Sequence, residues 1–267
     1  MELRLGVILP ALLPTTTMAG HSKWAGIKHK KAIVDAQRGK AFTKVVREIT
    51  AAARLGGGSP DANPRLRLAI QKAREVNLPK DSLEKAIKRG TGELEGQSFE
   101  EMMIEGYGPG GVAVLVEALT DNKNRTSAEV RSLFANHGGN LAGAGSVSWL
   151  FQKKGLITLN ARGLQEEALM ELALNAGAED LKVEEQQATV LSAPQHFEAV
   201  KHALQSGGLT AESADMTMIP SSTVQVTDPA QVKALLALLN ALEDQEDVQH
   251  VYANFDIPDA LLAEHGV

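Results

Sequence analysis

Residues 155–219 decide the fold of the middle of this chain: GLITLNARGLQEEALMELALNAGAEDLKVEEQQATVLSAPQHFEAVKHALQSGGLTAESADMTMI. Short apolar and β-branched runs predict four strands, at 156–159, 181–184, 188–191 and 216–219. Two helical patterns lie between them, at 165–176 and 194–205. The order β-α-β-β-α-β is that of a ferredoxin-like fold.

The flanking segments carry a second set of alternating elements. Strands expected at 112–119 and 147–151 surround a helix that Thr126 and Glu129 would cap. Farther on, strands expected at 223–227 and 248–254 surround a helix that begins after Asp228-Pro229. We therefore expect a ferredoxin-like α+β domain (153–221) inserted into another α+β domain, which is made of 96–152 and 222–267.

Residues 18–95 predict a basic helical domain. Lys40–Leu55 has the spacing of an amphipathic helix, with an apolar face opposite a stripe formed by Lys40, Lys44, Arg47 and Arg54. Asn63-Pro64 predicts the start of a second helix, and Asp81 with Glu84 predicts a capping box that opens a third. Three short helices with short turns are typical of a small bundle.

Charge is divided sharply along the chain. Residues 18–90 hold 17 Lys and Arg against 6 Asp and Glu, a net charge of +11, whereas residues 91–267 hold 9 against 26, a net charge of −17. This division indicates a basic surface for a polyanion beside an acidic body.

An arm rich in cations precedes the first helix. Residues 21–31 read HSKWAGIKHKK, in which lysines alternate with a tryptophan and two histidines. The lysines suit phosphate neutralisation with counterion release, and Trp24 suits stacking on a base. The alternative is that Trp24 and Ile27 pack the arm against the helical core while the lysines are only solvated.

Residues 1–17 (MELRLGVILPALLPTTT) are apolar but shorter than the roughly 20 residues of a membrane helix. Pro10 and Pro14 interrupt the run, and the basic start and cleavage site of a signal peptide are missing. Because Met18 opens the strongly patterned region, we expect it to be the natural start and 1–17 to be a non-native extension. No other stretch predicts a membrane span.

Several chemistries lack support in the sequence. The chain has no cysteine, which excludes disulfides, thiolate metal sites and cysteine nucleophiles. Residues 106–111 fit G-x-G-x-x-G, but they precede a strand instead of following one, so a shaped turn is favoured over a nucleotide site. We read 121–126 as a turn with a helix cap, and the acidic pairs at 100–101 and 166–167 as helix starts. We expect no catalytic residues, no metal and no cofactor.

The chain resembles the YebC/PmpR family in a series of motifs: AGHSKW (19–24), IKHK (27–30), RGKAFTK (38–44), REI (47–49), NPRLR (63–67), NLPKD (77–81), EGYGPGG (105–111), TDNKNRT (120–126), GGNL (138–141) and GSV (145–147). The resemblance runs from Met18 to about Asp256. It implies a helical domain followed by two α+β domains, one inserted in the other. It also implies nucleic-acid binding without catalysis.

Two functions are compatible with this resemblance. Family members are catalogued as probable transcriptional regulators, which implies a cytoplasmic DNA-binding protein. Mitochondrial relatives act as translational activators, which implies a ribosome-associated factor that binds rRNA or tRNA. Phosphate contacts carry no sequence information, so the basic residues serve both readings. A membrane partner or a small-molecule substrate is not expected, and the oligomeric state stays open.

The residues expected to touch nucleic acid share positive charge or aromatic character: His21, Lys23, Trp24, Lys28, Lys30 and Lys31 on the arm, and Lys40, Lys44 and Arg47 on the helix. The Gly-rich segment is a candidate partner-docking loop, made of Glu105, Gly106, Tyr107, Gly108, Pro109, Gly110 and Gly111.

Overall fold

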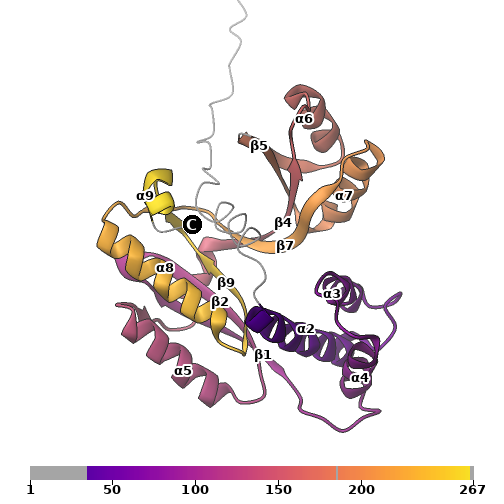
Figure 1. The fold of residues 1–267 in the computed structure, drawn as a ribbon, viewed down its shortest axis with the longest axis vertical. Helices are drawn as coiled ribbons and strands as arrows, with labels where there is room; N and C mark the ends of the chain where they lie inside the picture. Colours follow the sequence, from indigo (N-terminus) through magenta and orange to yellow (C-terminus); the bar gives the residue numbers. More distant parts are fainter. Residues whose placement is uncertain (1–34, 185, 265–267) are drawn as a thin grey trace, which may run out of the picture.

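The computed structural model of the chain describes residues 35–184 and 186–264 (Figure 1). The expected extension at 1–17 and the arm residues His21 to Lys31 lie outside the described residues. Among those that are described, no helix combines the length and the apolar character that crossing a membrane requires.

Three helices of the described residues form what we call the helical unit: α2 (Asp35–Gly56), α3 (Pro64–Glu75) and α4 (Lys80–Thr91). Their apolar faces meet in a core of small and aliphatic side chains, in which Ile49 and Leu66 are the largest that are fully buried. The helical spacing read from the sequence is confirmed for this face. Helix α2 lies beside the first of the two sheets (Figure 1), and its residues Lys44 and Arg47 contact residues 243–247.

Asn63 joins the first two helices. Its carboxamide oxygen accepts a hydrogen bond from Leu66 N at 3.1 Å, which caps α3 as the sequence predicts. Its nitrogen donates to Ala52 O at 2.8 Å and to Gly57 O at 2.9 Å, which satisfies carbonyls at the end of α2. The capping box expected at Asp81 is wrong, because α4 already begins at Lys80 after Pro79, which makes no side-chain cap.

The first sheet has the strand order β3-β1-β2-β9 and is antiparallel throughout. Its strands are β1 (Glu100–Tyr107), β2 (Ala113–Thr120), β3 (Asn140–Leu141) and β9 (Val248–Ala253). Helices α5 (Lys123–Asn136) and α8 (Pro229–Asp244) cover one face (Figure 1), where Phe134 and the α8 leucines form the largest core. Side chains alternate across β2, so Val114 and Val116 enter this core while Leu115 packs on the other face.

The second sheet has the order β5-β6-β4-β7 and is also antiparallel. Its strands are β4 (Phe151–Asn160), β5 (Ala178–Glu184), β6 (Gln187–Ser192) and β7 (Ala211–Pro220). Helices α6 (Glu166–Asn175) and α7 (Phe197–Ser206) pack on one face around Ile157, Val190 and Val200. The expected strand and helix order of 155–219 is found element by element.

Short elements complete the molecule. The strands β8 (Val224–Gln225) and β10 (Phe255–Asp256) pair in parallel, and α9 (Asp259–Glu264) ends the described chain. Three single-turn 3-10 helices, η1 (Pro109–Gly111), η2 (Ser148–Leu150) and η3 (Pro194–His196), lie at strand ends and before α7.

Three local expectations in the first α+β region are wrong. The acidic pair at 100–101 opens strand β1, not a helix. Residues 147–151 form η2 and the first residue of β4, because the backbone N–H groups of Val147 and Ser148 bind the Glu105 carboxylate. Helix α5 is capped by Asn122, so Thr126 lies inside the helix.

Replacing Asn63 with alanine removes the cap of α3 and leaves buried carbonyls of α2 without their donor. We expect the free energy of unfolding to fall by about 1–3 kcal/mol, measured by urea denaturation. Gln71→Ala on the exposed side of the same helix should change it by less than about 0.5 kcal/mol. An equal effect of the two substitutions would contradict this role of Asn63.

Candidate nucleic-acid interface

Three of the four cations in the α2 stripe, Lys40, Lys44 and Arg47, contact an acidic turn, whereas Arg54 is exposed. This acidic turn, Glu243 to Asp247, consists of the last two residues of α8 and the three residues that lead to β9. Lys40 Nζ lies 3.3 Å from an Asp244 carboxylate oxygen, and Lys44 Nζ donates to the Glu243 carbonyl at 2.6 Å. Helical spacing therefore placed these cations on one face correctly, and their contact with nucleic acid stays a prediction.

Arg47 makes the closest set of contacts with this turn. Its guanidinium donates to the Asp247 carboxylate at 2.6 Å and to the Glu246 carbonyl at 2.5 Å. Its central carbon also lies 5.4 Å from the centre of the Phe99 ring, in cation–π range. With only 13 % of its side chain exposed, Arg47 anchors the helical unit to the sheets.

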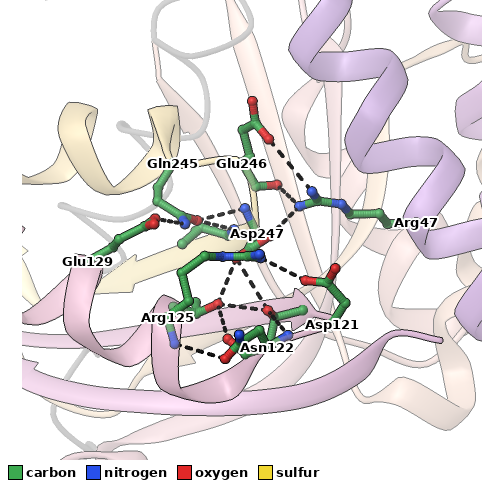
Figure 2. Close-up of polar contacts among 11 residues, drawn as sticks. Arg47, Asp121, Asn122, Arg125, Glu129, Gln245, Glu246 and Asp247 are labelled. Atoms are coloured by element: carbon green, nitrogen blue, oxygen red, sulfur yellow. Dashed lines mark hydrogen bonds and ion pairs between the residues drawn. The ribbon is translucent and has the colours of Figure 1, made fainter. Parts of the chain in front are cut away.

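Asp247 is the partner on which these contacts converge (Figure 2). One carboxylate oxygen, Oδ1, receives Arg47. The other, Oδ2, accepts from Thr126 at 2.6 Å, Arg125 at 2.9 Å and Thr120 at 3.3 Å. The side chain is 3 % exposed, so its charge is compensated entirely by protein groups.

Electrostatics keep Asp247 ionised. Burial alone would raise the pKa of its carboxyl group, but the hydrogen bonds from Thr126 and Arg125 and the charges of Arg47 and Arg125 outweigh burial, so the pKa lies below its usual range. The carboxylates of Asp247 and Asp121 likewise raise the pKa of Arg125. The network thus contains a permanently charged centre at neutral pH.

Two further cations of the helical unit contact acidic residues elsewhere. Arg65 on α3 donates to Glu48 at 2.8 Å and also binds Glu101 at the start of β1. Burial alone would lower the pKa of Arg65, but these carboxylates raise it. Lys72 lies about two turns farther along α3. Its Nζ is 3.0 Å from a carboxylate oxygen of Asp215 on β7.

The remaining cations of the helical unit point outward. Seven are exposed across α2, α3 and α4: Arg54, Arg67, Arg74, Lys80, Lys85, Lys88 and Arg89. On the described part of the helical unit, they form the basic surface most accessible to a partner. The arm residues His21, Lys23, Trp24, Lys28, Lys30 and Lys31 precede the described residues, so their role stays a prediction.

A cavity of about 730 Å³ lies between the helical unit and the two sheets. Its wall includes Met102, Met216 and Met218, together with the paired side chains of Glu117 and Tyr252. The Tyr252 hydroxyl donates to Glu117 at 3.1 Å. Burial raises the pKa of both groups, and for Glu117 it outweighs the opposing hydrogen bond.

The Gly-rich segment forms the turn between β1 and β2. Glu105, Gly106 and Tyr107 belong to β1, Gly108 is buried beside α8, and Pro109, Gly110 and Gly111 form η1. Gly110 and Gly111 adopt φ of 76° and 74°, which favours glycine. Their exposed backbone is the part of this segment that a docking partner could reach.

Glu105 has a structural role that sequence reasoning missed. Its carboxylate accepts hydrogen bonds from Gly145 N at 2.7 Å, Val147 N at 2.6 Å and Ser148 N at 2.9 Å. Burial alone would raise its pKa, but these backbone donors lower it. Trp149 follows directly after Ser148 and exposes 70 % of its surface. The sequence signal that could have identified Trp149 was an aromatic residue shortly after a Gly-rich run.

A metal site requires a close group of ligating side chains. In residues 35–184 and 186–264, no group of three or more His, Asp or Glu side chains has an arrangement that could hold a metal ion.

Sequence reasoning also missed the acidic turn and Asp247. The signal was the run EDQED at 243–247, which complements the α2 stripe.

The Asp247 network predicts acid-sensitive stability. A carboxyl group whose folded pKa is lowered stabilises the protein above its unfolded pKa of about 4, and this contribution is lost as the pH falls toward the folded pKa. Asp247→Asn should lower the free energy of unfolding by at least about 1.5 kcal/mol at neutral pH and flatten its decline below about pH 5.

The measurement is urea denaturation between neutral pH and about pH 3. Asp61→Asn, on the exposed loop before α3, is the matched control and should leave the profile unchanged. A wild-type pH profile retained by Asp247→Asn would contradict the assigned network.

Known protein families and relatives match this chain over most of its length. Residues 22–93 match the model of the TACO1/YebC N-terminal domain, and residues 99–255 match that of the TACO1/YebC second and third domains. A probable transcriptional regulatory protein of Syntrophobacter fumaroxidans is 54 % identical over 245 residues, covering 92 % of this chain and 98 % of the relative. One of Geobacter sulfurreducens is 56 % identical over 240 residues, covering 90 % and 96 %.

A solved structure has the same fold. The crystal structure of a conserved hypothetical protein from Aquifex aeolicus matches with a TM-score of 0.79 at 52 % identity, covering 88 % of this chain and 97 % of that one. The family models span most of the sequence, and the relatives are similar over nearly their whole length. The chain therefore belongs to the TACO1/YebC family.

Proposed function

We propose that this protein is a cytoplasmic, non-catalytic regulator of gene expression that binds nucleic acid through its basic helical unit and N-terminal arm. The observation that carries the proposal is the segregation of charge, +11 over residues 18–90 against −17 over residues 91–267. The names of the relatives, which call them probable transcriptional regulatory proteins, support a regulatory role.

Geometry supports the helical unit as the binding element. Exposed cations occur on all three of its helices, and a rigid helical core holds them in place. Lys85, Lys88 and Arg89 are close in sequence on α4, where spacings of three and four residues bring side chains to one side of a helix. Such a surface binds phosphates without reading sequence.

We also infer a three-part organisation for this function. The basic helical domain covers 18–95, an α+β domain combines 96–152 with 222–267, and a ferredoxin-like domain at 153–221 is inserted in it. The strand order β5-β6-β4-β7 and the two helices on one face support the ferredoxin-like inference. The acidic domains would position the helical unit.

DNA is the target that the names of the relatives favour, and ribosomal or transfer RNA is the alternative. The exposed Trp149 and the arm residue Trp24 suit stacking on unpaired bases, which single-stranded RNA offers more readily than a duplex. Crosslinking in cells, followed by sequencing of both DNA and RNA, distinguishes the two. Promoter enrichment would support transcription, whereas rRNA or tRNA enrichment would support translation.

The arm provides a test of nucleic-acid binding itself. Neutralising three of its lysines, with Lys23→Gln, Lys28→Gln and Lys30→Gln, should weaken binding and flatten the slope of log K against log salt by about 2–3. The measurement is a fluorescence anisotropy titration at several salt concentrations, with duplex DNA and single-stranded RNA as separate probes.

The control carries the same charge change on the acidic domains, with Arg131→Gln, Arg162→Gln and Lys233→Gln at exposed positions. It should retain the wild-type slope. Equal slopes for both triple variants would contradict a role for the arm, and no binding to either probe at low salt would contradict the proposed function.

A further inference from the structure

The helical unit meets the rest of the molecule through cations on one side and acidic segments on the other. We call this contact the seam. Across it, Lys40, Lys44 and Arg47 of α2 contact residues 243–247. From α3, Arg65 reaches Glu101 and Lys72 reaches Asp215. Five cations thus reach three separate acidic segments, so the seam has the charge pattern of a protein bound to a polyanion.

Apolar packing contributes less to the seam than to either side of it. The buried apolar cluster of the helical unit is built from residues of its own three helices and the α3–α4 turn. Where the helices face the sheets, a cavity of about 730 Å³ lies between them. Polar contacts therefore make up much of the seam, and salt and competing anions weaken its exposed ion pairs, such as Lys40–Asp244 and Lys72–Asp215.

The contacts of Asp247 allow the seam to open. Its Oδ2 keeps Thr126, Arg125 and Thr120, all of which belong to the sheet side. Arg47 alone comes from the helical unit, and it binds Oδ1. When Arg47 leaves, the buried carboxylate still has a cation and two hydroxyl donors, so no uncompensated charge stays behind.

The α2 stripe has the spacing of a phosphate-binding surface. Lys40, Lys44 and Arg47 lie at helical intervals of four and three residues, so they span about 10 Å along α2. Along the axis of a duplex, the phosphates of one strand follow one another at about 3.4 Å, so about three lie within that axial length. In the closed molecule, each of these cations meets one or more oxygens of the acidic turn.

We propose that the acidic turn Glu243 to Asp247 occupies the phosphate positions of the α2 stripe, and that a nucleic-acid backbone competes with this turn for Lys40, Lys44 and Arg47. The inference rests on the proposed function and adds a second surface to it. The outward cations of the helical unit make first contact, and the stripe is gained when the seam opens. The partner that fits this face is a sugar–phosphate backbone.

Tethering gives the acidic turn an advantage over nucleic acid in solution. A segment of the same chain is present at an effective concentration in the millimolar range. A weak, nonspecific polyanion would therefore leave the seam closed, whereas a strand already held by the outward cations competes on equal terms. Competition from the acidic turn therefore favours strands that are long enough to reach both surfaces over shorter strands.

The test neutralises the exposed part of the turn while keeping the Asp247 network. Asp244→Asn combined with Glu246→Gln removes two carboxylates that are 65 % and 72 % exposed. We expect this variant to bind single-stranded RNA and duplex DNA about threefold to tenfold more tightly than the wild type. Anisotropy titrations with 20-nucleotide probes measure the change.

The control removes the same charge elsewhere. Glu166→Gln with Glu167→Gln, in the first turn of α6, changes the net charge equally but lies on the second sheet's helical layer. Its affinity should stay within twofold of the wild type. If this variant binds as tightly as the seam variant, general charge explains the gain and the inference is wrong.

A second readout follows the seam directly. Because the chain has no cysteine, dyes can be placed at Gln71→Cys on α3 and Ala230→Cys on α8 without removing native thiols. Energy transfer between them should change on saturation with the probe, and the seam variant should show part of that change without it. Binding with unchanged energy transfer overturns the inference alone, whereas no binding overturns the proposed function as well.

Discussion

The ion pair between Arg47 and Asp247 sets the arrangement of the whole molecule. It joins residues that are 200 positions apart and connects the helical unit to the turn before β9. Asp247 can accept it because Thr126 and Arg125 already hold the carboxylate charged and in place. Burying such a group is favourable only when its hydrogen bonds are satisfied. Among the ion pairs that the described residues form across the seam, this pair has the least exposed side chains.

The molecule is held together by two kinds of contact, aliphatic cores and ion pairs. The sheets and their helices are held by aliphatic cores, in which the α8 leucines and Phe134 are fully buried. The helical unit is held to them by the buried Arg47–Asp247 pair and by exposed and half-exposed ion pairs beside a cavity. Apolar cores are insensitive to salt, whereas exposed ion pairs are weakened by it. This difference is what the proposed opening of the seam by a polyanion requires.

The sequence predicts the elements of this fold well and their long-range contacts poorly. Hydrophobic periodicity is local, so α2, α8 and the elements from β4 to β7 can be recognised from neighbouring residues. Strand β1 was missed because its acidic first residues look like a helix start, and its pairing with β2 supplies the stabilisation. The α5 cap was misplaced for a similar reason: Thr126 is committed to Asp247, which lies far along the chain. Charge counting found the basic unit, but only the three-dimensional structure shows that the α2 stripe is already occupied.

The most direct test of the competition between the acidic turn and nucleic acid is amide hydrogen exchange of the whole chain with and without a saturating oligonucleotide. If the backbone of a strand replaces residues 243–247 on α2, exchange at the turn and the following residues should speed up on binding. Exchange in α2 should stay constant or slow down. Slower exchange at both the turn and α2, or no change at either, would contradict the account.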